Sequence, residues 1–202
     1  MLSKDMQTFS LVCEALRNMG TADAYALLKQ HIHTPDLYRR RYVLSVIFDF
    51  PQAWELTSEL ERAMESSTNF LVTTALEQLR TGTVQVSDEA ILSCFERSNN
   101  CLDSSFYSVL SRIQKSDGHY QRIRKLYDSS TSTSTKIALA ECLYAFADGH
   151  NFESLYILFR NASAAHIRIL ACRIARDFQR GDWLQTFRDD PDGHIRKLAA
   201  AL

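Results

Sequence analysis

Glycine and proline are scarce in this sequence: there are six and three among 202 residues. Segments in which β-branched residues alternate with polar ones, as they do in half-buried strands, are also rare. Together these absences favour helices over sheets. With 46% hydrophobic residues, the chain is too apolar to be disordered and long enough for one large domain. We therefore expect an all-α globular protein.

The sequence also lacks long apolar runs and a strong excess of charge. No run approaches the roughly 20 apolar residues that span a bilayer, and the N-terminus has none of the parts of a signal peptide. A formal net charge of -1 argues against a protein whose main task is to coat nucleic acid or an acidic membrane. We expect a cytoplasmic protein, or the cytoplasmic part of a longer membrane-anchored one, because an initial methionine does not prove a complete gene product.

Motifs of catalysis and metal binding are absent as well. There is no Gly-x-Gly-x-x-Gly, P-loop, Gly-x-Ser-x-Gly or His-Glu-x-x-His, and His31 and His33 lie two apart, which is poor spacing for metal ligands. The odd number of scattered cysteines, with no Cys-x-x-Cys, indicates reduced and mostly buried thiols: Cys13, Cys94, Cys101, Cys142 and Cys172. We expect no enzymatic activity, no metal and no cofactor.

Residues 190–202 have the pattern of a complete short helix. Asp190 is a plausible N-cap and Pro191 fits the first helical position, where a missing N–H costs nothing. Asp192 and Arg196 stand four apart, which favours an ion pair on the helix surface. Behind them lies one apolar stripe: Ile195, Leu198, Ala199 and Leu202. Such a helix needs a neighbour to cover its apolar side.

Helix-period apolar positions recur along the whole chain. They predict helices over 5–19, 22–32, 35–50, 52–65, 69–80, 87–97, 103–115, 120–127, 136–147, 152–160, 164–180, 182–188 and 191–202. The first two form a hairpin separated by Gly20 and Thr21, and the others alternate as first and second helices of pairs. The Ser/Thr-rich stretch 129–135 is interpreted as a connector.

The second helices recur at a nearly constant distance. Their last expected buried positions are spaced by about 31 residues on average: Ile47, Leu79, Ile113, Leu143, Ile174 and Leu202. Four glycines follow second helices, where a left-handed C-cap is favoured: Gly82, Gly118, Gly149 and Gly181. A two-helix unit with this period predicts an α-solenoid, in which each unit buries its apolar face only by stacking on the next.

The pattern Pro191-Asp192-x-x-Ile195-Arg196-x-x-Ala199-Ala200-x-Leu202 strongly resembles the second helix of a HEAT repeat, particularly the short kind of bacterial and phycobilisome-lyase-like proteins. Residues 165–174 are a second clear copy, 135–143 a weaker one, and 69–79 and 105–113 keep only the apolar positions. The tetratricopeptide and ankyrin patterns are absent. The resemblance implies a right-handed α–α superhelix of about six helical pairs. Residues 1–202 would be a single domain, with 1–33 as a capping hairpin and 34–202 as HEAT-like repeats.

In a HEAT solenoid the second helices line the concave face, so the resemblance implies that their exposed cations form a mildly basic inner wall. On the 164–180 helix, Arg173, Arg176 and Arg180 lie opposite the apolar side. The candidate residues for binding an acidic peptide, a partner protein or phosphates are Tyr38, Arg41, Arg173, Arg176, Arg180 and Lys197. The alternative is that Arg40, Arg168 and Arg196 join neighbouring repeats through carboxylates and that the other cations are only solvated.

These patterns favour a non-catalytic scaffold that binds a protein partner on its concave face. HEAT-like solenoids also include alkylpurine DNA glycosylases, which hold DNA on a basic concave face with Trp, Asp and Arg around the lesion. Here the two tryptophans, Trp54 and Trp183, fall on first helices, so that constellation does not transfer. A nucleic-acid binder of that type is the alternative function, and phycobilin lyase activity has no matching residues. The apolar C-terminal end predicts contact with another repeat, another subunit or a partner.

Overall fold

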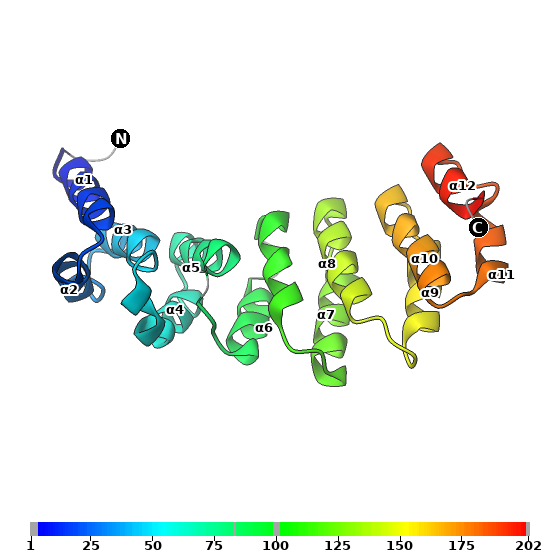
Figure 1. Cartoon of the computed structure of the whole chain (residues 1–202), viewed down its shortest axis with the longest axis horizontal. Coiled ribbons are helices and arrows are strands. Elements are labelled where there is room, and N and C mark those ends of the chain that lie inside the picture. Colours follow the sequence, from blue (N-terminus) through cyan, green and yellow to red (C-terminus); the bar gives the residue numbers. More distant parts are fainter. Residues whose placement is uncertain (1–3, 83, 99–101, 201–202) are drawn as a thin grey trace. The chain divides into compact units, whose positions relative to one another are not determined.

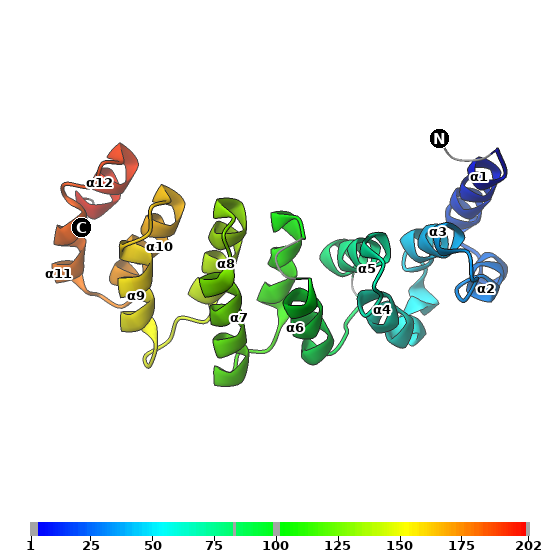
Figure 2. The ribbon, with the colours of Figure 1, turned by 180° about the vertical axis from the view of Figure 1, so that it is seen from behind.

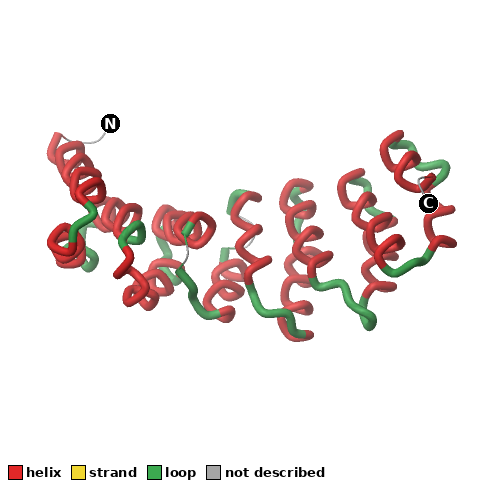
Figure 3. The backbone as a smooth tube through the Cα atoms, in the orientation of Figure 1, coloured by secondary structure: helices red, strands yellow, loops and turns green. Residues whose placement is uncertain are grey.

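The computed structural model describes residues 4–82, 84–98 and 102–200. Within these ranges the chain consists of helices, turns and loops without a strand (Figure 3), so the predicted all-α class is confirmed. The chain divides into two compact units, Met1–Arg97 and Ser98–Leu202. The single domain over 1–202 stays a prediction. No helix in the described ranges is long and apolar enough to cross a membrane.

The first unit contains α1 (Lys4–Met19), α2 (Ala22–Gln30), α3 (Leu37–Ile47), the 3₁₀ helix η1 (Pro51–Leu56), α4 (Thr57–Met64), α5 (Asn69–Thr81) and α6 (Asp88–Arg97). Within it, α3 packs between α1 and α5, α2 packs on both α1 and α3, and α4 packs on α5 and α6 (Figure 1). The second helices α3 and α5 are therefore direct neighbours.

The second unit contains η2 (Ser104–Arg112), α7 (Asp117–Ser129), α8 (Thr133–Ala145), α9 (Phe152–Arg160), α10 (Ala165–Asp177), α11 (Gly181–Leu184), η3 (Gln185–Phe187) and α12 (Gly193–Ala200). Its second helices follow one another in sequence order, because α8 packs on η2 and α10, and α10 packs on α12 (Figure 2). The first helices α7 and α9 pack on α8 and α10, their partners in the predicted pairs.

The positions that define the predicted period are buried wherever the structure describes them, while the repeat itself stays a prediction. Ile47, Leu79, Ile113, Leu143 and Ile174 are all buried, whereas Leu202 lies outside the described residues. Four of the five cysteines are free and buried, as predicted, and Cys101 lies outside the described residues. Burial raises the pKa of the Cys142 thiol to about 12 and the pKa values of the other three thiols to about 11. These thiols therefore stay protonated at neutral pH.

The predicted α-helix over 103–115 is instead the 3₁₀ helix η2. Its serines recur every third residue, and their hydroxyls bond to the backbone: Ser108 Oγ donates to the Ser105 carbonyl (2.8 Å) and Ser111 Oγ to the Ser108 carbonyl (2.6 Å). Serine hydroxyls that bond backbone carbonyls compete with α-helical geometry, and a three-residue step matches the 3₁₀ turn. The predicted 52–65 helix is likewise divided into η1, which begins at Pro51, and α4.

The helices around the Ser/Thr-rich connector are longer than predicted. The predicted 120–127 helix is α7, which begins at Asp117 because the Ser116 hydroxyl accepts a hydrogen bond from the His119 amide (3.2 Å). Ser132 caps α8 in the same manner, so the connector shortens to residues 130–132. Serine caps thus define both helix starts.

The left-handed C-caps predicted at Gly82, Gly118, Gly149 and Gly181 are wrong. Among the described residues, only Gly20 (φ 63°) and Gln179 (φ 56°) have left-handed backbones. Gly82 ends α5 in an extended conformation, but it needs to be glycine because a Cβ there would lie 2.6 Å from the Gln78 carbonyl oxygen. Gly118 and Gly181 lie in the first turns of α7 and α11, and Gly149 lies in a turn. The glycine spacing therefore has no common structural cause.

The N-cap predicted at Asp190 is also wrong, since α12 begins at Gly193 and Asp192 caps it. The Asp192 Oδ1 atom accepts hydrogen bonds from the amides of His194 (2.8 Å) and Ile195 (3.3 Å). Because the Asp192 carboxylate accepts these two backbone hydrogen bonds, it does not form the predicted ion pair with Arg196. Asp36 caps α3 in the same way, which places Tyr38 in the first turn of that helix.

Candidate partner-binding surface

Two of the predicted binding residues meet on a third residue that sequence reasoning missed. The ring of Tyr38 on α3 stacks on the ring of Phe70 on α5, with 5.2 Å between centroids and 14° between planes. The guanidinium of Arg41 lies 5.9 Å from the Phe70 centroid. Tyr38 remains 53% exposed, and Arg41 is exposed. We call Tyr38, Arg41 and Phe70 the Tyr38 patch.

The Tyr38 patch offers an aromatic surface and a cation that is still available. No carboxylate among the described residues lies within ion-pair distance of Arg41, whereas its neighbour Arg39 contacts both Asp36 (3.6 Å) and the Phe9 ring (5.3 Å to the centroid). Exposed Tyr and Arg side chains are the residue types that most often carry binding energy at protein interfaces. The patch can therefore hold an apolar group and pair with one carboxylate.

Arg173, Arg176 and Lys197 lie on the exposed surface of α10 and α12 in the second unit. Arg173 and Arg176 line a crevice together with Leu198, but its volume of about 20 Å³ admits a water molecule and no side chain. Arg176 also lies 3.7 Å from the Asp177 carboxylate. These three cations form an open basic surface without a preformed pocket.

Arg180 has other contacts. Its guanidinium lies 4.0 Å from the centroid of the Trp183 ring, 3.2 Å from a carboxylate oxygen of Glu153 and 3.3 Å from one of Asp182. It thereby joins α9 to α11. Because two carboxylates and an indole already occupy the guanidinium, we leave Arg180 out of the proposed binding surface.

Arg168 joins one helical pair to the next, as the alternative interpretation of the arginines predicted. Its Nε and Nη2 atoms donate to both carboxylate oxygens of Asp190 (2.8 and 2.9 Å), and its Nη1 donates to the carbonyls of Ala162 and Ser163 (3.0 and 2.7 Å). The two charged side chains are only 13% and 6% exposed. The hydrogen bonds from Arg168 hold the pKa of Asp190 below its usual range.

Arg196 and Arg40 do not form the same ion pair. Arg196 Nη1 donates to the carbonyls of Asp190 and Pro191, which precede it by six and five residues, just as Ala162 and Ser163 precede Arg168. Within the described ranges no carboxylate pairs with Arg196. The Nε of Arg40 is buried and has no hydrogen-bond partner there. The predicted bridges of Arg40 and Arg196 therefore do not form among the described residues, and for Arg196 a bridge to a further repeat stays a prediction.

These surfaces offer exposed aromatic and cationic side chains that can contact another molecule. In the part of the chain that the structure describes, no group of three or more His, Cys, Asp or Glu side chains is placed to hold a metal ion. No family model and no curated protein matches the chain in sequence.

Proposed function

We propose that the protein is a non-catalytic scaffold that binds a protein partner through exposed side chains of its second helices. The Tyr38 patch carries the proposal, because it combines a large exposed aromatic surface with an arginine that has no carboxylate partner among the described residues. Fully desolvating such residues at an interface typically supplies most of its binding energy. The partner segment would present an apolar group to Tyr38 and Phe70 and a carboxylate to Arg41.

A HEAT-like, right-handed α-solenoid is part of this proposal. It is supported by the alternation of first and second helices, by the direct packing of α3 on α5 and of α8 on α10 on α12, and by the buried Arg168–Asp190 pair. In HEAT repeats an aligned arginine joins neighbouring repeats in this way. The free, buried thiols are consistent with a cytoplasmic location, which we propose as well.

We also propose that the end of the second unit contacts a further repeat, a second subunit or a partner. The guanidinium of Arg196 is oriented by the same two carbonyl contacts as that of Arg168, yet its Nε has no carboxylate partner among the described residues. A carboxylate from outside would complete the arrangement seen at Arg168. This part would be contradicted if the protein is strictly monomeric and if its Arg196→Ala variant still binds every partner that the wild type binds.

The scaffold function is tested by comparing what immobilised wild-type and variant proteins bind. We expect the wild type to capture a protein partner, and this capture should persist after nuclease treatment. Neither the Tyr38→Ala variant nor the Arg41→Ala variant should capture the partner. The matched control is Ile157→Ala, which removes an exposed apolar side chain (59%) from the other unit and should leave binding unchanged. Equal capture by wild type and both patch variants would contradict the proposal.

The alternative, a nucleic-acid binder related to alkylpurine DNA glycosylases, is tested with the same protein. Its cationic contact would be the open basic surface of Arg173 and Arg176 on α10. DNA binding that weakens steeply with salt and is lost in the Arg173→Ala, Arg176→Ala double variant would favour it over the protein scaffold. Elution from heparin at low salt and no measurable DNA affinity would support the scaffold.

A further inference from the structure

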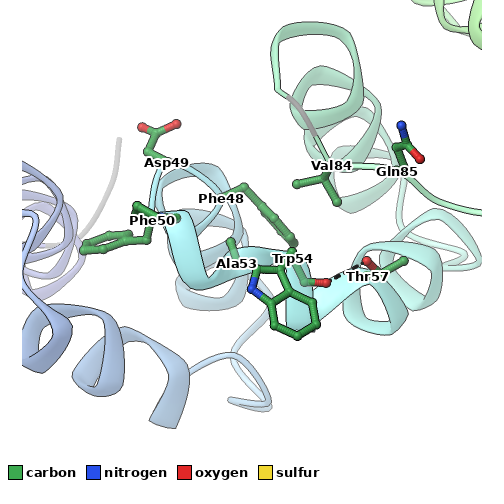
Figure 4. Close-up of a pocket in the computed structure, with 9 residues that line it drawn as sticks. Phe48, Asp49, Phe50, Ala53, Trp54, Thr57, Val84 and Gln85 are labelled. Carbon is green, nitrogen blue, oxygen red and sulfur yellow. Dashed lines mark hydrogen bonds between the residues drawn. The ribbon is translucent and has the colours of Figure 1, made fainter.

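A second candidate site lies within the first unit, around a tryptophan that the Tyr38 patch does not include. A pocket of about 420 Å³ opens between the end of α3, the 3₁₀ helix η1 and the segment that follows α5. Figure 4 shows its lining, which includes Phe48, Ala53, Trp54, Thr57, Val84 and Gln85. All of these residues belong to the unit Met1–Arg97.

Trp54 is directed into solvent by the local backbone. Pro51 begins η1, and within that short helix Ala53 and Leu56 are the buried residues. A 3₁₀ helix repeats every three residues, so Ala53 and Leu56 share its buried side and Trp54 falls outside it. The Trp54 carbonyl accepts a hydrogen bond from Thr57 Oγ1 (2.9 Å), which holds the turn. At 75% exposure, Trp54 is the most exposed large hydrophobic side chain that the structure describes.

The pocket beside Trp54 has an apolar floor and one charge. Phe48 and Val84 are 8% and 7% exposed, so both are held in place by their neighbours and only a small part of each side chain faces the pocket. The indole N–H of Trp54 has no acceptor among the described residues. Asp49 is the one charged residue among the described lining residues, and Figure 4 shows it on the opposite side of Phe48 from Val84 and Gln85.

This combination restricts the occupant. An apolar side chain can pack between the indole face and the floor, and the indole N–H can donate to a backbone carbonyl, which an extended peptide leaves free. Proline suits this position because a polyproline II segment is already ordered before it binds. The Asp49 carboxylate is half-exposed and lies 3.7 Å from Arg17, so it retains capacity for a second cation. Arg17 is paired more closely with Glu14 (2.9 Å), so two carboxylates share one cation and an acidic ligand would be repelled there.

We infer that the Trp54 pocket binds an extended, proline-containing peptide segment that carries a lysine or arginine next to its apolar residues. The Trp54 pocket prefers a positively charged residue in its ligand, whereas the Arg41 cation of the Tyr38 patch selects a carboxylate. The two sites therefore recognise different segments, and the Trp54 pocket does not depend on the function proposed for the Tyr38 patch.

The two-tryptophan sequence permits a direct test on the intact chain. In a ¹⁵N-labelled sample the two indole N–H signals are assigned with Trp54→Phe, and the protein is titrated with acetylated, amidated decapeptides built on Pro-Pro-x-Pro with Lys or Arg at either end. We expect a saturable shift of the Trp54 signal and none of the Trp183 signal. Peptides in which Glu replaces the basic residue should bind at least about tenfold more weakly, because Asp49 repels them.

Variants separate the pocket from the other surfaces. Trp54→Ala should weaken binding at least about tenfold, as expected for a tryptophan anchor, and Asp49→Asn should weaken only the basic peptides, by about threefold to tenfold. Tyr38→Ala and Ile157→Ala serve as controls and should change nothing. Because Trp54 is exposed, its variant should fold, which circular dichroism verifies.

Three results would overturn the inference: no shift of the Trp54 signal with any basic peptide at millimolar concentration, unchanged affinity in Trp54→Ala, or equal binding of the acidic peptides. Loss of binding in Tyr38→Ala would instead assign the peptide to the Tyr38 patch. If the Trp54 pocket does not bind these peptides, the proposed capture of a partner through Tyr38 and Arg41 is unaffected. The two proposals can therefore fail independently.

Discussion

In the unit Ser98–Leu202 a buried ion pair joins one second helix to the segment before the next, whereas in the unit Met1–Arg97 a neutral hydrogen bond, at another place along the helices, links two neighbouring second helices. Arg168 and Asp190 form the ion pair. In the first unit, Gln78 on α5 donates to the carbonyl of Ser45 on α3 (3.2 Å). The same stacking of second helices is thus obtained with different polar chemistry.

The difference traces to one position in the turn before each second helix. Asp190 lies two residues before the cap residue Asp192, and its carboxylate accepts a hydrogen bond from the Asp192 amide (2.8 Å). Ser66 precedes the N-cap residue Thr68 by two and accepts the Thr68 amide in the same way (3.0 Å). Arg40 and Arg168 each stand four residues after an N-cap, Asp36 or Ala164. The first unit therefore has the arginine and the turn but a hydroxyl in place of the carboxylate.

The largest expected effect is the loss of the ion pair. Arg168→Ala leaves the Asp190 carboxylate buried and two loop carbonyls without their donor, so we expect the free energy of unfolding to fall by about 3 kcal/mol. Arg40→Ala should cost less than about 1 kcal/mol, because its Nε has no partner to lose. Urea unfolding of both variants measures the difference, and equal costs would contradict the comparison.

The same pair should make part of the stability depend on pH. The pKa of Asp190 is lowered in the folded state, so its contribution is present above the unfolded pKa of about 4 and is lost as the pH falls through the lower, folded value. We expect the wild type to lose more unfolding free energy than Asp190→Asn between pH 5 and pH 2, with those limits set roughly by the unfolded pKa. If the unfolding free energy of the two proteins falls with pH by the same amount, Asp190 is not ionised in its pair with Arg168.

Introducing the missing carboxylate should stabilise the first unit. If Ser66 occupies the place of Asp190, Ser66→Asp gives Arg40 a charged partner, and we expect a gain of about 1 kcal/mol in unfolding free energy. Ser67→Asp, at the exposed neighbouring position, should give no gain. The gain must also vanish in the background of Arg40→Ala. A gain that survives there would show that the two turns are not equivalent.

The smallest expected effect concerns the end of α10. Gln179 holds a left-handed backbone at φ 56°, and the next amide, of Arg180, donates to the Ala175 carbonyl (2.7 Å). Glycine adopts this conformation without strain, so Gln179→Gly should add about 0.5 kcal/mol of stability. Gln185→Gly, at an ordinary helical backbone of φ -57°, should instead cost about 0.5 kcal/mol. Thermal unfolding compares the two.

Periodicity predicted the succession of helices well, and local polar chemistry determined where it failed. α9 matches its predicted bounds, Phe152–Arg160, because its apolar residues have a clear helical period. The 3₁₀ geometry of η2 follows from serine hydroxyls that bond backbone carbonyls, which a hydrophobic pattern does not register. The left-handed residue after α10 is a glutamine, so glycine positions gave the wrong caps.

The candidate sites were less predictable, because they depend on contacts between helices. Tyr38 and Arg41 could be selected as exposed positions on a helical projection, but Phe70 joins them from α5, and helical spacing alone does not reveal which neighbour it meets. Arg180 lies on the same side of the helical projection as Arg173 and Arg176, yet its guanidinium contacts Glu153 and the Trp183 ring. The sequence pattern places Trp54 on a first helix, whereas its exposure results from the 3₁₀ turn after Pro51.

The four buried thiols supply internal reporters of local opening. Cys13 and Cys94 lie in one unit and Cys142 and Cys172 in the other, and each becomes reactive only when its surroundings open. In a Cys101→Ser background, the rates of disulfide exchange with a small reagent therefore give an opening free energy at four points along the chain. Equal values in both units would mean that 1–202 unfolds as one cooperative body, and unequal values would rank the two units by stability.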